Sequence, residues 1–306
     1  MNSKNGPWRI PAALVVGSLL LTACTGAEPE ADNDTTAKDQ DAITIGTVPG
    51  WSDQTGIAYL YEYVLEENGY EVEVQDTVDV APAYEAVAEG ELDLYAAAWP
   101  EGAQNVYWEE HQDHLEPLGV VYEDAQLFLG VPESSEITSI EELPDYADEL
   151  DGQITGIEAG AGLSVITEEE VMPHYGLDED FELQFSSADG MVDQLEDAIE
   201  NNDEIVVTLW TPYWVTEQYD MRALEDPDMI YGEPESVQTL GRPGFTADYP
   251  EIARMIENFS LTTDQIADLQ HTMINEFDDD DPAAVQAWLE DNPDIVEQMS
   301  ADLNNK

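Results

Sequence analysis

Apolar and polar positions follow two alternating patterns from residue 42 onward. Short β-rich runs predict strands at residues 43–48, 71–76 and 92–98, and helical spacing predicts helices at 56–67 and 81–89. This strand–helix–strand order predicts right-handed crossovers and a parallel sheet. In such a sheet, ligands bind beyond the carboxyl ends of the strands.

A second α/β set follows the first. Apolar runs predict strands at residues 126–132, 153–156, 182–185 and 204–209, with helices at 164–175 and 191–201. After an extended segment at 236–242, three helices are predicted at 249–258, 263–275 and 282–292. We therefore expect an α/β fold of two parallel-sheet lobes, residues 42–127 with 239–303 and residues 128–238. The hinge is expected near Leu127 and Gln238.

The N-terminus carries the pattern of a targeting segment. Lys4 and Arg9 precede an apolar run at residues 12–21, which is too short to span a bilayer and typical of a secretory signal. The run ends in Leu21-Thr22-Ala23-Cys24, which resembles the bacterial lipobox, so residues 1–23 are expected to be cleaved and Cys24 lipidated. The alternative is an incidental cysteine within a cleaved signal. Residues 24–41 are polar and acidic and predict a flexible tether, which places the protein on the outer face of the membrane.

The charge balance limits the possible partners. The chain of 306 residues holds 70 Asp and Glu against 7 Lys and Arg, for a net charge of -63. Nucleic acid is excluded, because its phosphates need basic contacts. Molar salt shortens the Debye length to about 3 Å and relieves self-repulsion, which suggests a halophilic source. Since 42% of the residues are hydrophobic, a substantial core is expected nonetheless.

Three tryptophans follow predicted strands at the edge where a ligand is expected. Trp51, Trp99 and Trp210 are far apart in sequence, yet parallel strands bring such positions to one cleft. Electron-rich indole faces suit a trimethylammonium group, which donates no strong hydrogen bond, and each desolvated contact contributes about 2 kcal/mol. The alternative is that the three indoles pack each lobe separately. Trp108, Trp214 and Trp288 are expected to be packing residues.

Several short segments resemble the glycine betaine and choline substrate-binding proteins of ABC importers. These segments are Gly50-Trp51-Ser52-Asp53, Ala98-Trp99-Pro100, residues 156–162 and Trp210-Thr211-Pro212-Tyr213-Trp214, in consistent order within residues 42–300. The resemblance implies a type II periplasmic-binding-protein fold that closes on its ligand, an ABC permease as partner and no enzymatic activity. It favours glycine betaine as the ligand, with choline or carnitine as the alternative.

The resemblance also implies roles for individual residues. Trp51 and Trp99 match aromatic residues of the first lobe and Trp210 matches one of the second. Asp53 matches an acidic residue near the cation of choline binders; capping of the following helix is its alternative role. Gly56 and Ile57 match backbone amides that hold a ligand carboxylate at a helix start, where unpaired N–H groups favour an anion.

Some positions depart from the family pattern. Tyr213 stands where many betaine binders carry His, although its hydroxyl could donate to a carboxylate, and Leu261 stands where some place Trp. The glycine-rich residues 156–162 allow two interpretations, a second anion-binding turn or a turn that permits tight packing.

Metal, cofactor and enzyme chemistry find little support. Cys24 is the only cysteine, and His111 and His114 lack further ligands, so no metal site is expected. His174 and His271 lack an evident nucleophile. We expect a monomer without a cofactor. The rival hypotheses are a sensing module for a membrane signalling partner and an extracellular hydrolase.

Overall fold

The computed structural model describes residues 42–77, 79–277 and 280–304. The predicted signal peptide, Cys24 and the acidic tether lie outside this part of the chain. Within it, no helix combines the length and the apolar character needed to cross a membrane.

The strands form one continuous hydrogen-bonded sheet. Their bounds are β1 Ile43–Thr47, β2 Val72–Asp76, β3 Leu94–Ala98, β4 Glu116–Pro132, β5 Gln153–Thr155, β6 Glu182–Gln184, β7 Val207–Thr211, β8 Met221–Ala223 and β9 Glu235–Gly241. The order is β2-β1-β3-β9-β4-β7-β5-β6, and β8 pairs with β4. One lobe is therefore built on β1, β2 and β3 and the other on β5, β6 and β7. We call them the first and the second lobe.

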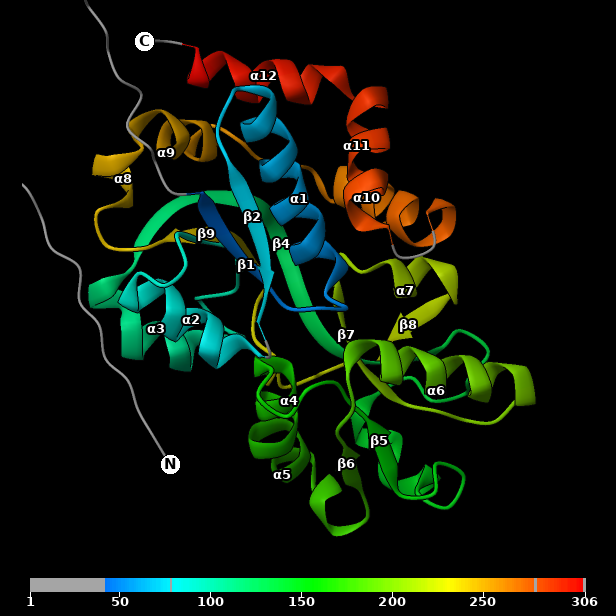
Figure 1. Ribbon diagram of the computed structural model, residues 1–306. Coiled ribbons are helices and arrows are strands. Elements are labelled where there is room, and N and C mark those ends of the chain that lie inside the picture. The colour runs from blue at the N-terminus through cyan, green and yellow to red at the C-terminus, as the bar shows by residue number, and fades with distance from the viewer. Residues whose placement is uncertain (1–41, 78, 278–279, 305–306) are drawn as a thin grey trace, which may run out of the picture. The chain divides into compact units, whose positions relative to one another are not determined.

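The helices cover the faces of these strands (Figure 1). Their bounds are α1 Ser52–Glu67, α2 Val80–Glu89, α3 Asn105–His111, α4 Gly162–Ile166, α5 Met172–Tyr175, α6 Ala188–Asn201, α7 Trp214–Gln218, α8 Phe245–Asp248, α9 Pro250–Glu257, α10 Thr263–Glu276, α11 Asp281–Asp291 and α12 Pro293–Leu303. In Figure 1, α10, α11 and α12 gather beside α1 at the first lobe, so the late helices return to the start of the chain.

The predicted parallel pairing holds at both ends of the sheet but not in its middle. β1 pairs in parallel with β2 and β3, and β5 pairs in parallel with β6 and β7. In contrast, β9 runs antiparallel to β3 and β4, and β4 runs antiparallel to β7. Each lobe therefore keeps the expected parallel pairing in its outer strands, and antiparallel pairing of β9 and β4 makes the sheet mixed.

The long strand β4 joins the two lobes. It spans 17 residues, whereas the pattern predicted only its last part, and its register on β9 shifts at three places. It pairs with β9 through Ala125 and with β7 from Gln126 onward, so the chain changes its sheet partner between these two residues.

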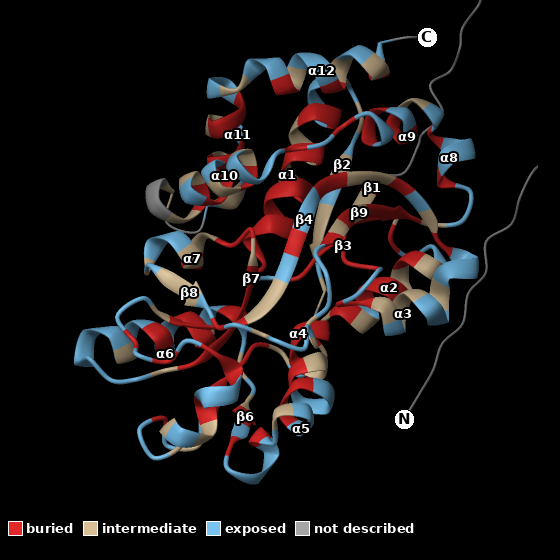
Figure 2. Cartoon of the chain, turned by 180° about the vertical axis from the view of Figure 1, so that it is seen from behind, coloured by how far each residue is buried: buried red, intermediate tan, exposed pale blue. Residues whose placement is uncertain are grey.

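Buried side chains form two apolar clusters. Figure 2 marks the buried residues of the chain in red. The smaller one is the internal core of the second lobe and includes Leu129, Ile154 and Leu177. The larger one fills the first lobe and continues to Ile157, Leu163 and Trp210 of the second. Apolar packing therefore crosses from one lobe to the other where the cleft is expected.

Helix α1 begins at Ser52, four residues earlier than the pattern predicted. Trp51 occupies its N-cap position, and its side chain makes no capping hydrogen bond. Gly56 therefore lies one turn inside the helix, where a Cβ would stand 3.0 Å from Leu269 and 3.1 Å from the Met273 sulfur. The glycine serves the close approach of α10 to α1.

Candidate functional site

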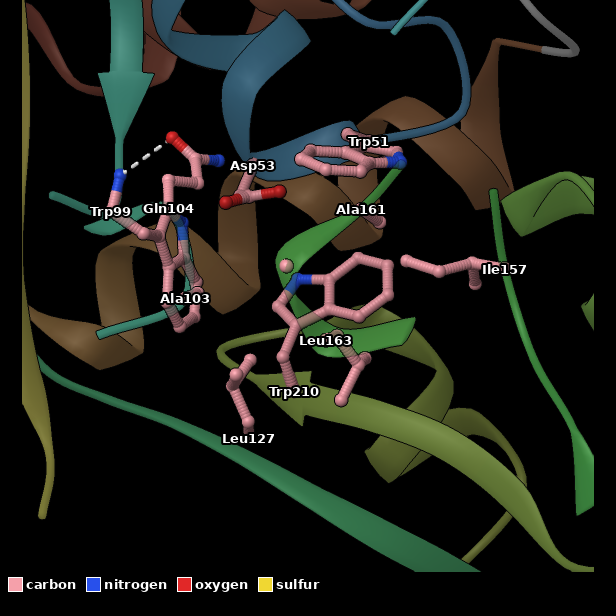
Figure 3. Close-up of a pocket in the computed structure, with 11 residues that line it drawn as sticks. Trp51, Asp53, Trp99, Ala103, Gln104, Leu127, Ile157, Ala161, Leu163 and Trp210 are labelled. Atoms are coloured by element: carbon pink, nitrogen blue, oxygen red, sulfur yellow. Dashed lines mark hydrogen bonds between the residues drawn. The ribbon is translucent and has the colours of Figure 1, made fainter. Parts of the chain in front are cut away.

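One cavity is lined by residues of both lobes and contains the three predicted tryptophans. The first lobe and β4 contribute Trp51, Asp53, Trp99, Ala103, Gln104 and Leu127, and the second lobe contributes Ile157, Ala161, Gly162, Leu163 and Trp210. Figure 3 shows Trp51 and Trp210 on the same cavity, with the Asp53 carboxylate between Trp51 and Trp99. The expectation that the indoles converge from distant parts of the chain is met in this arrangement.

Trp51 is positioned by the turn between β1 and α1. Gln54 holds this turn, because its Oε1 accepts the Val48 N–H and its Nε2 donates to the Ala97 carbonyl at 3.2 Å. The turn is thereby tied to the end of β3, where Trp99 follows. Trp51 and Trp99 thus follow the ends of two neighbouring strands, because β1 and β3 pair in parallel.

Trp99 begins a short loop that closes on itself. The Trp99 N–H donates to Gln104 Oε1 at 3.0 Å, and the Gln104 N–H donates to the Trp99 carbonyl at 2.8 Å. Gln104 is fully enclosed at 2% exposure, and its side chain also lines the cavity. The loop therefore presents an indole and an amide to the same space.

Trp210 lies near the end of β7 and is supported by Tyr213. Their rings are stacked, with centroids 3.9 Å apart and planes inclined by 17°. The Trp51 ring is 6.2 Å from the Trp210 ring at an angle of 47°. Trp51, Trp99 and Trp210 are all at least nine-tenths buried, and together we call them the indole cage.

Asp53 is the only ionisable side chain among the cavity-lining residues. Tyr122 of β4 donates its hydroxyl to Asp53 Oδ2 at 2.7 Å, whereas Asp53 Oδ1 has no hydrogen-bond partner in the described protein. Burial raises the pKa of this carboxyl above its ordinary value, and the Tyr122 hydrogen bond opposes that rise. A buried carboxylate oxygen without a partner favours a cation or a hydroxyl donor in the cavity.

The two lobes touch directly beside the cavity. Trp51 Nε1 donates to Glu158 Oε2 at 3.2 Å, and the Tyr107 hydroxyl donates to the Gly160 carbonyl at 2.7 Å. A Cβ on Gly162 would stand 1.4 Å from the Ala103 carbonyl oxygen, so only glycine fits there. The glycine-rich residues 156–162 therefore permit tight packing against the opposite lobe as well as within their own.

A buried glutamine bridges the rear of the site. Gln270 of α10 accepts hydrogen bonds from the Ser52 hydroxyl and the Trp214 N–H and donates to the Pro212 carbonyl. It thereby connects the start of α1, next to Trp51, with the segment that follows Trp210. Both walls of the indole cage share this support.

Three predicted binding residues lie away from the cavity surface. Gly56 and Ile57 are inside α1, and Tyr213 contacts the rear of Trp210. The structure does not bring these three to the cavity lining. The early start of α1 at Ser52 places Gly56 and Ile57 within the helix, and the Trp210 ring separates Tyr213 from the cavity. Leu261 is buried and its N–H donates to the Val121 carbonyl.

Sequence reasoning missed several residues of the site. Gln104, Ala103, Leu163 and Tyr122 were not singled out, and Glu158 was noticed only as part of a resembling segment. The signal for Gln104 was available, since it follows Trp99 by five residues beyond a buried strand. The Tyr122 contact had no local signal.

The remaining candidates lie outside this site. Trp288 is buried and donates its Nε1–H to Asp268, and Trp108 and Trp214 pack against the core. His111 and His114 are on α3 and the turn after it, away from the cavity lining. Within residues 42–77, 79–277 and 280–304, no three acidic, histidine or cysteine side chains are grouped so as to hold a metal ion.

A family model and several solved structures match this chain. The substrate-binding domain of ABC-type glycine betaine transport systems matches residues 41–291. A solved glycine betaine/L-proline-binding protein of Borrelia burgdorferi is 30% identical with a TM-score of 0.79, covering 86% of this chain and 100% of its own. A lactococcal protein solved closed with glycine betaine is 26% identical with a TM-score of 0.78, covering 85% and 99%.

A curated relative is the glycine betaine/carnitine transport binding protein of Listeria monocytogenes. It is 34% identical over 153 residues, and the match spans 50% of this chain and 50% of that relative. A choline-binding protein solved with choline shares the fold, with a TM-score of 0.76 at 24% identity over 86% of this chain and 98% of its own. The fold is accordingly the two-lobed fold of periplasmic binding proteins. The chain belongs to the substrate-binding domains of ABC-type glycine betaine transport systems, a family of transport proteins and not of enzymes.

Proposed function

We propose that the protein captures a quaternary-ammonium solute between its lobes and delivers it to an ABC permease. The supporting observation is the indole cage, which joins rings of both lobes around a cavity whose one ionisable side chain is an acid. Three desolvated cation–π contacts of about 2 kcal/mol each supply much of the about 8 kcal/mol that micromolar binding needs. Ligand held by both lobes stabilises their contact, so a permease can distinguish the loaded protein from the empty one.

Glycine betaine is the first ligand candidate, because the matching family and the relatives carry its name. Its carboxylate needs donors. The expected amides of Gly56 and Ile57 are inside α1, whereas Gly162 and Leu163 line the cavity at the start of α4. Their N–H groups precede the first intrahelical hydrogen bond of α4 and can donate to the ligand carboxylate.

Choline is the second candidate, and Asp53 favours it. The unpartnered Oδ1 could accept the choline hydroxyl, while the ionised carboxylate attracts the cation. Tyr122 fixes the other carboxylate oxygen, so the orientation of Asp53 is set before the ligand enters. The ligand preference depends on whether Asp53 is charged in the complex.

Titration calorimetry in molar salt with glycine betaine, choline, carnitine and proline tests the proposal. We expect binding of at least one trimethylammonium solute and much weaker binding of proline, which lacks that group. No heat of binding with all four solutes would remove the transport proposal, and hydrolytic turnover of a solute would favour an enzyme instead.

The proposal extends to the parts of the chain outside the structure. Cleavage after residue 23, lipidation of Cys24 and a tether of residues 24–41 would hold the binding lobes at the outer membrane face. The acidic composition supports work at high salt by a monomer. The change of sheet partner at Gln126 supports a lobe boundary near residue 127. Mass spectrometry of the membrane fraction would detect a diacylglycerol on an N-terminal Cys24.

A further inference from the structure

Glu235 is a buried acid outside the cavity lining. It is the first residue of β9 and is 8% exposed. Its Cα pairs with Ala125 of β4, one residue before β4 changes partner from β9 to β7. Glu235 therefore lies at the point where β4 passes from the first lobe to the second.

Three consecutive backbone amides converge on this carboxylate. Glu101 and Gly102 donate their N–H groups to Oε2 at 3.1 and 2.9 Å, and Ala103 donates to Oε1 at 2.8 Å. These amides belong to the loop that begins at Trp99 and ends at Gln104. Burial raises the pKa of Glu235 and the three amide hydrogen bonds oppose that rise.

The Glu235 carboxylate also lies close to the Gly102 backbone. A Cβ on Gly102 would stand 2.8 Å from Glu235 Oε1, so a side chain at residue 102 would press on the carboxylate and shift it from the amides. Charge-assisted hydrogen bonds of this kind are about twice as strong as neutral ones.

The loop itself touches both the ligand cavity and the opposite lobe. Trp99, Ala103 and Gln104 line the cavity. The Ala103 carbonyl meets Gly162 of the second lobe so closely that no side chain fits between them. One carboxylate at the lobe crossing thus fixes a wall of the cavity and the point where the lobes meet.

We propose that Glu235 is a positioning residue, which holds the Trp99–Gln104 loop from the lobe crossing and thereby sets Trp99 for ligand binding and Ala103 for contact with Gly162. This inference rests on the proposed binding function, because its consequence for affinity requires a ligand in the cavity. It predicts that the carboxylate acts on affinity through Trp99 and the Ala103 contact and not through general stability.

The test uses the full chain in molar salt with Glu235→Gln and Gly102→Ala. The first replaces an acceptor oxygen by an NH₂ group that faces an amide donor, and the second displaces the carboxylate at unchanged charge. Glu233→Gln is the matched control, since it removes the same charge two residues away at an exposed position. We expect both test variants to weaken binding of choline or glycine betaine at least about tenfold, and the control to leave it unchanged.

Two further measurements separate positioning from stability. Amide hydrogen exchange at residues 101–103 of the ligand-free protein should accelerate in both test variants and not in the control. In a Trp99→Ala background, Glu235→Gln should cost less affinity than in the wild-type background, because the part of its effect that passes through the indole is already lost. Undiminished amide protection, or the same loss of affinity in both backgrounds, would overturn the proposal.

Failure of the wild-type protein to bind any of these solutes would overturn the proposed function, and with it the affinity part of this inference. The exchange measurement needs no ligand, so it still decides whether the carboxylate holds the loop. The two failures are therefore distinguishable.

Discussion

Replacing Asp53 by asparagine should weaken the binding of choline but not the binding of glycine betaine. The substitution keeps the size of the side chain and an acceptor for the Tyr122 hydroxyl, which is 2.7 Å from Oδ2. It removes the one ionisable group of the cavity lining. Choline loses its counter-charge, and glycine betaine loses a like charge near its carboxylate.

The magnitude follows from the burial of Asp53. At an effective dielectric constant of about 20, two unit charges about 4 Å apart interact by about 4 kcal/mol. Desolvation of the cation and the carboxylate offsets part of this attraction, because Asp53 is only 2% exposed. We therefore expect Asp53→Asn to weaken choline binding by about 2 kcal/mol, or about thirtyfold in Kd.

The assay is calorimetric titration of both ligands with wild-type protein and Asp53→Asn in the same molar salt. Glycine betaine affinity should stay equal or rise. Glu233→Gln controls for the loss of one charge from an already acidic protein. Equal losses for both ligands would refute the reasoning, since a merely structural defect would not distinguish a cation from a zwitterion.

Three other perturbations test separate parts of the site. Trp99→Ala and Trp210→Ala should each weaken ligand binding by about 2 kcal/mol in the same titration, and unchanged affinity in both would mean that the indoles do not form the binding site. Gly162→Ala should force the lobes apart, because the new Cβ would stand 1.4 Å from the Ala103 carbonyl oxygen, and should weaken ligand binding by about 1–3 kcal/mol. X-ray scattering of the variant with ligand should show a less compact particle than the wild-type protein, and equal compaction would contradict this. Because burial raises the pKa of Asp53, choline affinity should fall as the pH falls through that pKa toward the ordinary value of 3.8, while protonation stabilises the ligand-free fold; a flat pH profile of choline affinity would show that the carboxylate does not pair with the cation.

The periodic parts of the fold could be predicted from the sequence. Residues 43–48, 92–98 and 204–209 are rich in apolar and β-forming residues, and the structure places β1, β3 and β7 there with Trp51, Trp99 and Trp210 near their ends. Parallel pairing at both ends of the sheet followed from the alternation of strands and helices. These local signals were sufficient to bring three distant indoles to one cavity.

The first part of β4 could not be predicted, because its pattern is irregular. Pro117, Gly119 and Asp124, the last with φ at 62°, interrupt the alternation, and the register on β9 shifts accordingly. Only tertiary pairing makes this stretch a strand.

The start of α1 was mispredicted for a different reason. Capping preferences favour Asp53 as the cap of a helix near Gly56. Instead Trp51 is the N-cap residue, and Gln54 and Thr55 tie the first turn to Val48 and Thr47. These contacts replace a local cap, so the helix begins earlier. The N–H groups of Gly56 and Ile57 are therefore inside the helix and not at the site.

A crystal structure of the complex with choline or glycine betaine tests the central claim most directly. The account predicts a trimethylammonium group within about 6 Å of the ring centroids of Trp51, Trp99 and Trp210 at once, with residues of both lobes around it. A ligand bound elsewhere, or three indoles that each pack within their own lobe around no ligand, would contradict it.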